Sequence, residues 1–161
     1  MKILIKNITE NLMNYEGNIE CEKLINNGDE IYFEEPMKFI GTLKKGINSV
    51  EISGKVFAKF STNCHLCGEK TEKKLEFEIF ETYRRESSED EYPLIGDEID
   101  FDDMILENFR LNFPVRILCK EDCKGICTRC GKNLNIEKCN CLNVEKTNPA
   151  FDVLNKLIKQ K

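Results

Sequence analysis

Residues 49–80 read SVEISGKVFAKFSTNCHLCGEKTEKKLEFEIF, and this stretch decides the fold. Apolar side chains occupy alternate positions on both sides of a central C-x-x-C-G motif, a spacing typical of strands with one buried face. We therefore expect an antiparallel pair of strands over 50–60 and 73–80, with the cysteine motif in their connection at 61–72.

The same period of two continues toward the N-terminus. Met37, Phe39 and Leu43 share one phase, whereas the stretch 15–27 shows no clear pattern. We expect residues 1–85 to form a β-rich domain that carries a zinc knuckle and is built as an antiparallel sheet or partial barrel.

An acidic stretch without periodicity follows at 86–99, and we expect it to be a linker or a loop. Asp100 is placed to cap a helix over 101–112 that covers the sheet. The apolar face expected for this helix comprises Phe101, Met104, Ile105, Leu106, Phe109 and Leu111. A last short helix is expected from Asn148. The fold class is therefore α+β, and residues 100–161 contain the covering helix, a cysteine-rich zinc segment and the C-terminal helix.

The chain has 161 residues, 33% of them charged, and a formal net charge of −5. This length suits one domain with appendages and a real core. No secretory leader and no apolar stretch of about 18 residues is visible, so we expect a cytoplasmic protein without a membrane partner. The motifs G-x-S-x-G, G-x-x-x-x-G-K-[ST] and G-x-G-x-x-G are absent, and there is one histidine. We therefore expect no enzymatic activity.

Nine cysteines in a reducing compartment indicate metal or redox chemistry and not a disulfide framework. Two pairs have the form C-x-x-C-G, in which both thiolates can reach one metal and the glycine allows the positive φ that turns the chain back. Structural zinc takes four ligands in a closed tetrahedron, so eight cysteines make two sites. We expect two zinc ions, held by Cys64, Cys67, Cys119, Cys123, Cys127, Cys130, Cys139 and Cys141.

The eight cysteines can be divided in two ways. We expect one site to close locally around the turn at 133–135, with the ligands Cys127, Cys130, Cys139 and Cys141. The other site then joins segments about 50 residues apart, with the ligands Cys64, Cys67, Cys119 and Cys123. In the alternative division, Cys119 and Cys123 share one site with Cys127 and Cys130.

Other chemistries of these cysteines are less favoured. A thioredoxin-like redox pair needs a strand-to-helix junction, whereas the surroundings here are a hairpin and irregular loop. Iron–sulfur ligation is compatible with the ligand type alone. Cys21 stands apart between two glutamates and is expected to be a free thiol. His65, inside the first motif, is a less favoured substitute ligand.

The stretch 96–141, GDEIDFDDMILENFRLNFPVRILCKEDCKGICTRCGKNLNIEKCNC, resembles the YceD family of bacterial large ribosomal RNA accumulation proteins. The similar features are an acidic lead-in, a helix ending at a hydrophobic residue and Pro, and the run LC-x-x-DCKG-[LI]-C-x-x-CG-x-NLN…C-x-C. The tail NPAFDVLNKLIK and the upstream pair Cys64 and Cys67 also fit the family. Leu66 stands where the family usually has Arg, and Phe113 where Leu is common.

The resemblance implies a role in accumulation or processing of 23S ribosomal RNA and in large-subunit biogenesis. The expected partner is ribosomal RNA or a pre-ribosomal particle, contacted through a basic stretch at 110–132. Its six cationic residues, against two acidic ones, are Arg110, Arg116, Lys120, Lys124, Arg129 and Lys132. The net negative charge counts against generic phosphate binding. The alternative is a zinc-stabilised adaptor that binds another protein without touching RNA.

Overall fold

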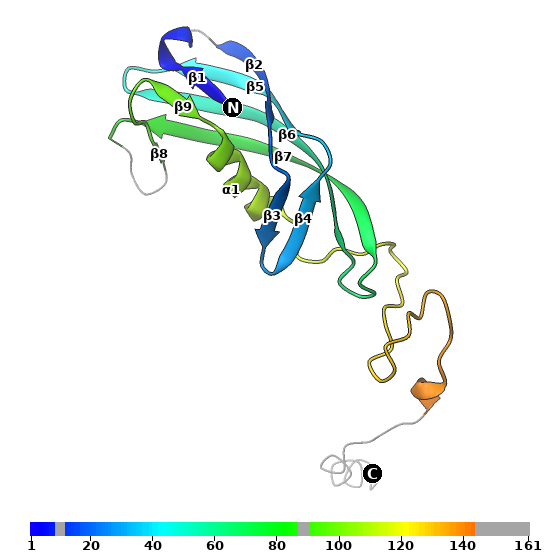
Figure 1. The fold of residues 1–161 in the computed structure, drawn as a ribbon. Helices are drawn as coiled ribbons and strands as arrows, with labels where there is room; N and C mark the ends of the chain where they lie inside the picture. Colours follow the sequence, from blue (N-terminus) through cyan, green and yellow to red (C-terminus); the bar gives the residue numbers. More distant parts are fainter. Residues whose placement is uncertain (9–11, 87–90, 144–161) are drawn as a thin grey trace, which may run out of the picture.

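The computed structural model of the chain describes residues 1–8, 12–86 and 91–143 (Figure 1). A curled β-domain forms one end of an elongated molecule, and the cysteine-rich segment extends from it at the other end. The strands are β1 (Lys2–Leu4), β2 (Met13–Ile19), β3 (Lys23–Asn26), β4 (Asp29–Phe33), β5 (Met37–Lys45), β6 (Ser49–Asn63), β7 (Lys70–Arg84), β8 (Tyr92–Pro93) and β9 (Glu98–Asp100). One α-helix, α1 (Asp102–Asn112), and two 3-10 turns, Ile5–Asn7 and Asn140–Asn143, complete the described elements.

The β6–β7 hairpin contains the two longest strands of the seven-stranded sheet. The two strands pair antiparallel over all 15 residues of each, from Ser49 opposite Arg84 to Asn63 opposite Lys70. β5 and β4 pair with the other edge of β6, β2 and β3 lie outside them, and β8 pairs with β7 in parallel. The expected strand pair is thus confirmed and extends further at both ends. Its alternate side chains are buried as expected, namely Val50, Ile52, Val56, Ala58, Phe60, Phe77 and Ile79.

Two glycines face each other in the middle of the sheet and allow it to pack closely. Gly41 on β5 lies opposite Gly54 on β6. A Cβ added to either glycine would come within 2.6 or 2.7 Å of the Phe39 ring, which is fully buried above the pair. Glycine at both positions therefore lets an aromatic side chain fill the concave side of a curled sheet.

Helix α1 covers the concave face of the sheet, as its apolar pattern predicts (Figure 1). Phe109 packs against three rings of the sheet, with centroids 5.2 Å from Phe33, 5.6 Å from Phe60 and 6.3 Å from Phe77. Leu111 was expected on this face, but 82% of its surface is exposed, because it lies about 200° around the helix from Phe109. An α+β architecture with a covering helix is therefore confirmed.

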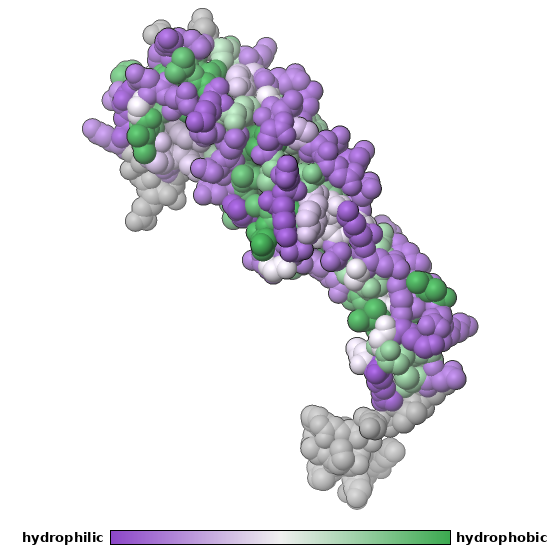
Figure 2. Space-filling view, in the orientation of Figure 1, coloured by the Kyte–Doolittle hydropathy of each residue, from purple (hydrophilic) through white to green (hydrophobic). Residues whose placement is uncertain are grey.

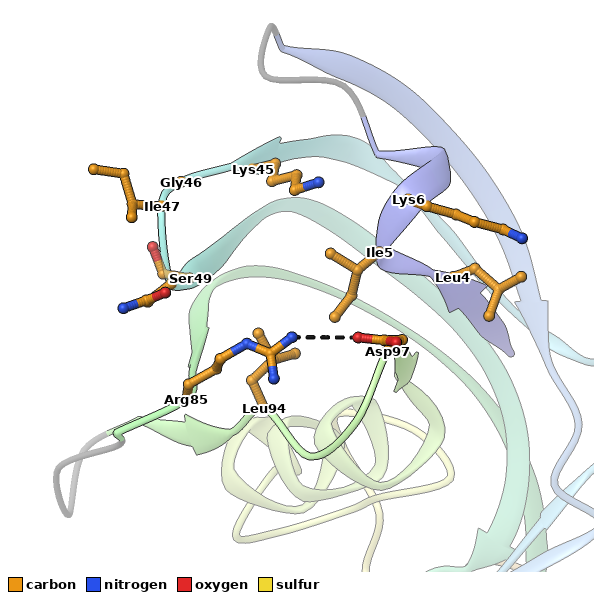
Figure 3. A pocket seen from close by; sticks show the side chains of 11 residues that line it. Leu4, Ile5, Lys6, Lys45, Gly46, Ile47, Ser49, Arg85, Leu94 and Asp97 are labelled. Atoms are coloured by element: carbon orange, nitrogen blue, oxygen red, sulfur yellow. Dashed lines mark hydrogen bonds and ion pairs between the residues drawn. The ribbon is translucent and has the colours of Figure 1, made fainter.

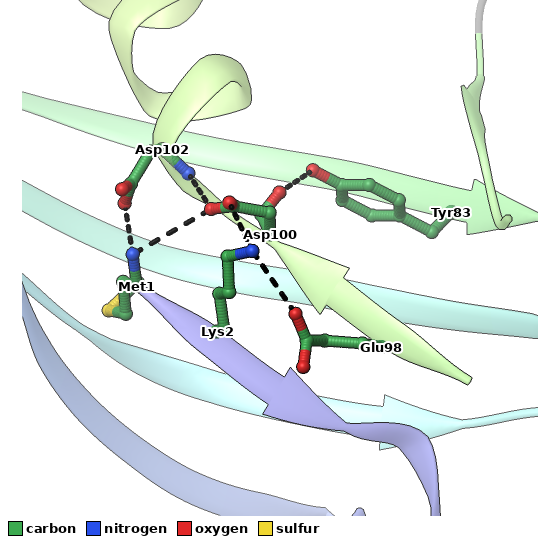
Figure 4. A network of polar contacts seen from close by, with 6 residues as sticks. All are labelled: Met1, Lys2, Tyr83, Glu98, Asp100 and Asp102. Atoms are coloured by element: carbon green, nitrogen blue, oxygen red, sulfur yellow. Dashed lines mark hydrogen bonds and ion pairs between the residues drawn. The ribbon is translucent and has the colours of Figure 1, made fainter. Parts of the chain in front are cut away.

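Acidic residues around the start of α1 form a polar network with the N-terminus (Figure 4). The Met1 α-amino group contacts the carboxylates of Asp102 and Asp100, and Lys2 pairs with Glu98 at 3.3 Å. The Asp100 carboxylate also accepts the N–H of Asp102 at 3.1 Å, but the N-cap position is Phe101, so the helix begins one residue later than expected and Asp100 lies just before the cap. Burial opposes ionisation of Asp100, but this N–H and the neighbouring cations hold its pKa below the ordinary value.

The acidic stretch expected to be a linker contributes two short strands in its described part. β8 adds two residues to the edge of β7, and β9 pairs with β1 in a separate two-stranded sheet. Strands of two or three residues are too short to give a visible period, which explains why the sequence did not indicate them. The ambiguous stretch 15–27 falls in β2 and β3. The helix expected from Asn148 lies outside the described residues.

Candidate metal centres

The eight predicted cysteines form two groups of four. Centre 1 consists of Cys64, Cys67, Cys119 and Cys123, and centre 2 consists of Cys127, Cys130, Cys139 and Cys141. Within each group all four Sγ atoms lie within 4.8 Å of one another. This is the division expected from the sequence, and the alternative grouping of Cys119 and Cys123 with Cys127 and Cys130 is not what the structure has.

The sulfur geometry fits a tetrahedral metal in each group. In centre 1 the Sγ atoms of Cys64 and Cys123 are 3.8 Å apart, and those of Cys67 and Cys119 are 3.6 Å apart. Ligands at a Zn–S length of about 2.3 Å around a tetrahedron are about 3.7 Å from each other. All nine cysteines are free of disulfides, so eight thiols are available as two four-sulfur ligand sets.

Both C-x-x-C-G motifs adopt the same local turn. In centre 1 the N–H of Cys64 donates to Glu69 O at 2.8 Å, and the N–H of Gly68 donates to Cys64 O at 2.9 Å. In centre 2 Cys127 and Gly131 make the equivalent bonds, each at 2.8 Å. Gly68 and Gly131 both have a φ of +74°, a conformation that strains any other residue. The motif therefore folds into a repeated knuckle that points two sulfurs at one place.

Backbone N–H groups favour ionisation of the first thiol in each knuckle. Burial opposes it at Cys64, but the N–H groups of Cys67, Leu66 and Cys119 lower the pKa of this thiol to about 6. At Cys127 the N–H groups of Arg129 and Cys130 also lower the thiol pKa to about 6. At Cys119, by contrast, burial and the neighbouring thiols raise the pKa. The Cys119 thiol therefore resists ionisation beside its neighbours until a cation joins them, which is the electrostatic environment of a thiolate metal site.

Two further residues considered as ligands or thiols have other contacts. His65 accepts the N–H of Ile117 at Nδ1, 3.2 Å away, and its Nε2 lies 3.0 Å from the Asp29 carboxylate. Both ring nitrogens are therefore occupied, and His65 belongs to neither sulfur group. The Cys21 thiol lies 3.6 Å from Lys23 O and is also outside both groups.

The six basic residues of 110–132 fall into two sets. Three have partners on the segment after the helix: Lys120 lies 3.8 Å from Asp122, Lys132 lies 2.9 Å from Glu137, and Arg129 donates to Cys141 O at 2.9 Å. In the described part of the chain, Arg110, Arg116 and Lys124 show no side-chain ion pair. The segment 114–143, called the metal arm below, also exposes apolar side chains, with Val115 98%, Ile136 77% and Ile126 48% exposed.

Surface features elsewhere are less specific. A cavity of about 420 Å³ lies between the N-terminal 3-10 turn and the β5–β6 turn, and Arg85 is paired with Asp97 inside it (Figure 3). The visible face of the molecule is mainly hydrophilic over the β-domain, with hydrophobic side chains also showing on the narrow metal arm (Figure 2). Among the described residues, no helix has the length and apolar character needed to cross a membrane.

Part of the chain is similar to known proteins. The family model described as large ribosomal RNA subunit accumulation protein YceD matches residues 52–158. One curated relative, "Large ribosomal RNA subunit accumulation protein YCED homolog 1, chloroplastic" from Arabidopsis thaliana, is 41% identical over 49 residues. That alignment covers 30% of this chain and only 15% of the relative. No solved structure matches the chain. Because the family match contains α1, the β6–β7 hairpin from Ile52 onward and all eight clustered cysteines, the chain belongs to the YceD family.

Proposed function

We propose that the protein is a zinc-binding, non-enzymatic factor in 23S ribosomal RNA accumulation and large-subunit biogenesis, acting by binding ribosomal RNA or a pre-ribosomal particle. The observation that carries this proposal is that the family match encloses two complete four-cysteine groups. The family's description supports the connection with large-subunit RNA, and the cysteine groups provide ligands for the metal.

Zinc is the metal that suits these ligands best. It prefers four-coordinate tetrahedral sites and is commonly held by thiolates alone. A metal enclosed by four protein sulfurs has no open position for water or substrate, so we assign both centres a structural role and expect no catalysis. Reduced thiols also require a reducing compartment, which fits the proposed cytoplasmic location.

The metal content tests the first half of the proposal. Protein purified under reducing conditions and without chelators is expected to contain two zinc ions per chain by elemental analysis. A stoichiometric iron content with visible charge-transfer absorption would identify an iron–sulfur protein instead.

RNA contact is proposed through the basic residues of 110–132, with Arg110, Arg116 and Lys124 as the most available. Reversing Arg116 and Lys124 to Glu should reduce the RNA retained after crosslinking in native lysate. It should also make the salt dependence of binding shallower, because binding with fewer phosphate contacts releases fewer counterions. The matched control reverses Lys38 and Lys44, which are paired with Glu16 and Glu51 on the outer face of the sheet. It changes the net charge equally and should leave RNA binding largely intact.

One observation favours a second candidate, a protein-binding adaptor. The metal arm has exposed aliphatic side chains and no aromatic residue on which a base could stack. Capture of one protein that is insensitive to salt and lost when Val115 is changed to Asp would support the adaptor. Loss of zinc in the Arg116 and Lys124 variant, without any change in salt slope, would leave these cations as counter-charges for the thiolates.

A further inference from the structure

The loop closed by centre 2 reaches into centre 1. Residues 131–138 lie between two ligands of centre 2, Cys130 and Cys139. The turn at 133–135 within this loop brings the Asn135 side chain to centre 1, where Nδ2 donates to the Cys123 Sγ at 3.4 Å. A residue held by one metal group thus contacts a sulfur of the other.

The orientation of the Asn135 amide is set by its other contacts. Its Oδ1 accepts the N–H of Lys124 at 2.9 Å, so the oxygen must face the backbone of the segment between Cys123 and Gly125. Its Nδ2 also donates to Asn133 Oδ1 at 2.8 Å. With the oxygen fixed by a donor, the NH2 group is the one that faces the sulfur. Such a donor stabilises a thiolate and is therefore suited to a metal ligand.

A second set of contacts joins the two knuckles. The N–H of Ile126 donates to Leu66 O, inside the knuckle of centre 1, at 3.0 Å. Asn133 Nδ2 donates to Glu69 Oε1 at 2.9 Å, just before the start of β7. Gly125, with a φ of +70°, permits this approach, because an added Cβ would lie 3.0 Å from Leu66 O. The turn at 133–135 and the residue before Cys127 therefore touch centre 1 from separate positions.

We propose that metal binding at the two centres is coupled, with Asn135 as the positioning residue that carries the coupling. The inference rests on the proposed metal binding. The cysteines of centre 2 flank the 133–135 turn on both sides, so a metal there holds the turn in place. A turn already in place offers the Asn135 donor to Cys123 without a further loss of conformational freedom. Metal at centre 2 thereby raises the affinity of centre 1, and linkage makes the effect reciprocal.

The coupling is measured by metal competition against a chromophoric zinc chelator under reducing conditions, supported by the sulfur-to-cobalt charge-transfer bands of the Co²⁺ protein. Replacing Cys139 and Cys141 by Ser should lower the zinc affinity of centre 1 about tenfold, the lower end of the range for loss of an outer-shell partner. Asn135→Ala should lower it by a similar factor with centre 2 intact. When Asn135→Ala is combined with the Ser replacements of Cys139 and Cys141, the two losses of centre 1 affinity should not add, since both remove the same contact.

Two further variants separate positioning from general disruption. Asn135→Asp keeps an oxygen for the Lys124 N–H but places a carboxylate against the thiolate, so it should weaken centre 1 more than Asn135→Ala. Asn140→Ala changes an exposed asparagine between two ligands of centre 2 and should leave centre 1 unchanged. In the protein loaded with ¹¹³Cd, Asn135→Ala should move the resonance of centre 1 and not that of centre 2.

The outcomes distinguish this inference from the metal binding on which it rests. Two ions bound with a centre 1 affinity that is the same with and without the centre 2 cysteines would overturn the coupling and leave the metal sites standing. Fully additive losses in the combined variant would show that Asn135 does not carry the coupling. A chain that binds no metal would overturn both proposals.

Discussion

Centre 1 and centre 2 share a ligand set and a knuckle, but they connect very different parts of the chain. Centre 1 brings together sulfurs 52 and 59 residues apart, joining the tip of the β6–β7 hairpin to the segment after α1. Centre 2 uses four cysteines within 127–141 and closes only its own loop. A metal held by four cysteines would thus act as a tertiary crosslink at centre 1 and would organise a local loop at centre 2. The difference comes from chain topology and not from the ligands.

The free energy of unfolding should differ most between the variant that lacks centre 1 and the variant that lacks centre 2. Replacing Cys67 and Cys119 by Ser should lower the free energy of unfolding by up to about 4 kcal/mol, the chain-entropy value for a crosslink closing a loop of about 50 residues. Chemical denaturation followed by circular dichroism measures this change. Elemental analysis should show that one metal is lost. An unchanged unfolding free energy would mean that the hairpin and the metal arm are held together without centre 1.

Removing centre 2 should affect the β-domain much less. With Cys139 and Cys141 replaced by Ser, we expect limited proteolysis to become faster within 126–143 only. The unfolding free energy of the β-domain should fall by about 1 kcal/mol, because centre 2 stabilises this domain only through its coupling to centre 1. If this variant unfolds as readily as the one without centre 1, the metal arm is a single cooperative unit and the two centres are not separable.

The two knuckle glycines allow a comparison in which the local strain is equal. Gly68 and Gly131 have the same φ, and an added Cβ would meet nothing within 4 Å at either position. Alanine should therefore cost about 1–2 kcal/mol of backbone strain at both. Gly68→Ala should lower the thermal midpoint of the whole domain, whereas Gly131→Ala should mainly weaken metal binding at centre 2, by about tenfold. Thermal melts combined with metal competition on both variants make the comparison.

The features that local spacing encodes could be predicted from the sequence. Alternation from Val50 to Phe60 identified the central strand, and the two C-x-x-C-G motifs identified both knuckles. For the division of the cysteines, local closure within 127–141 favoured one grouping and left one alternative open, and the structure has the favoured grouping. The sequence did not indicate β8 and β9, whose few residues carry no period. It did not single out Asn135 either, since the contact with Cys123 depends on how two separate loops meet.

The smallest expected effect concerns the residue after the first cysteine of each knuckle. In centre 1 this residue is His65, which contacts the Ile117 N–H and the Asp29 carboxylate and so ties the knuckle to two other segments. In centre 2 it is Thr128, and the next residue, Arg129, donates back to Cys141 within the same centre. His65 therefore contributes to the tertiary role of centre 1, whereas its counterpart lies in a motif that contacts its own loop.

Two substitutions separate the contacts of His65. Asn keeps an acceptor near the position of Nδ1 and loses the Asp29 contact, whereas Gln keeps a donor near the position of Nε2 and loses the acceptor for Ile117. His65→Asn should cost less than 1 kcal/mol, about the value of a partly exposed polar pair. His65→Gln should cost about 1 kcal/mol, because it leaves a partly buried N–H without its acceptor. Both should keep two metal ions per chain and the charge-transfer spectrum of the Co²⁺ protein. Loss of one ion or a changed spectrum in either variant would make His65 a ligand of centre 1 and would remove the contrast with Thr128.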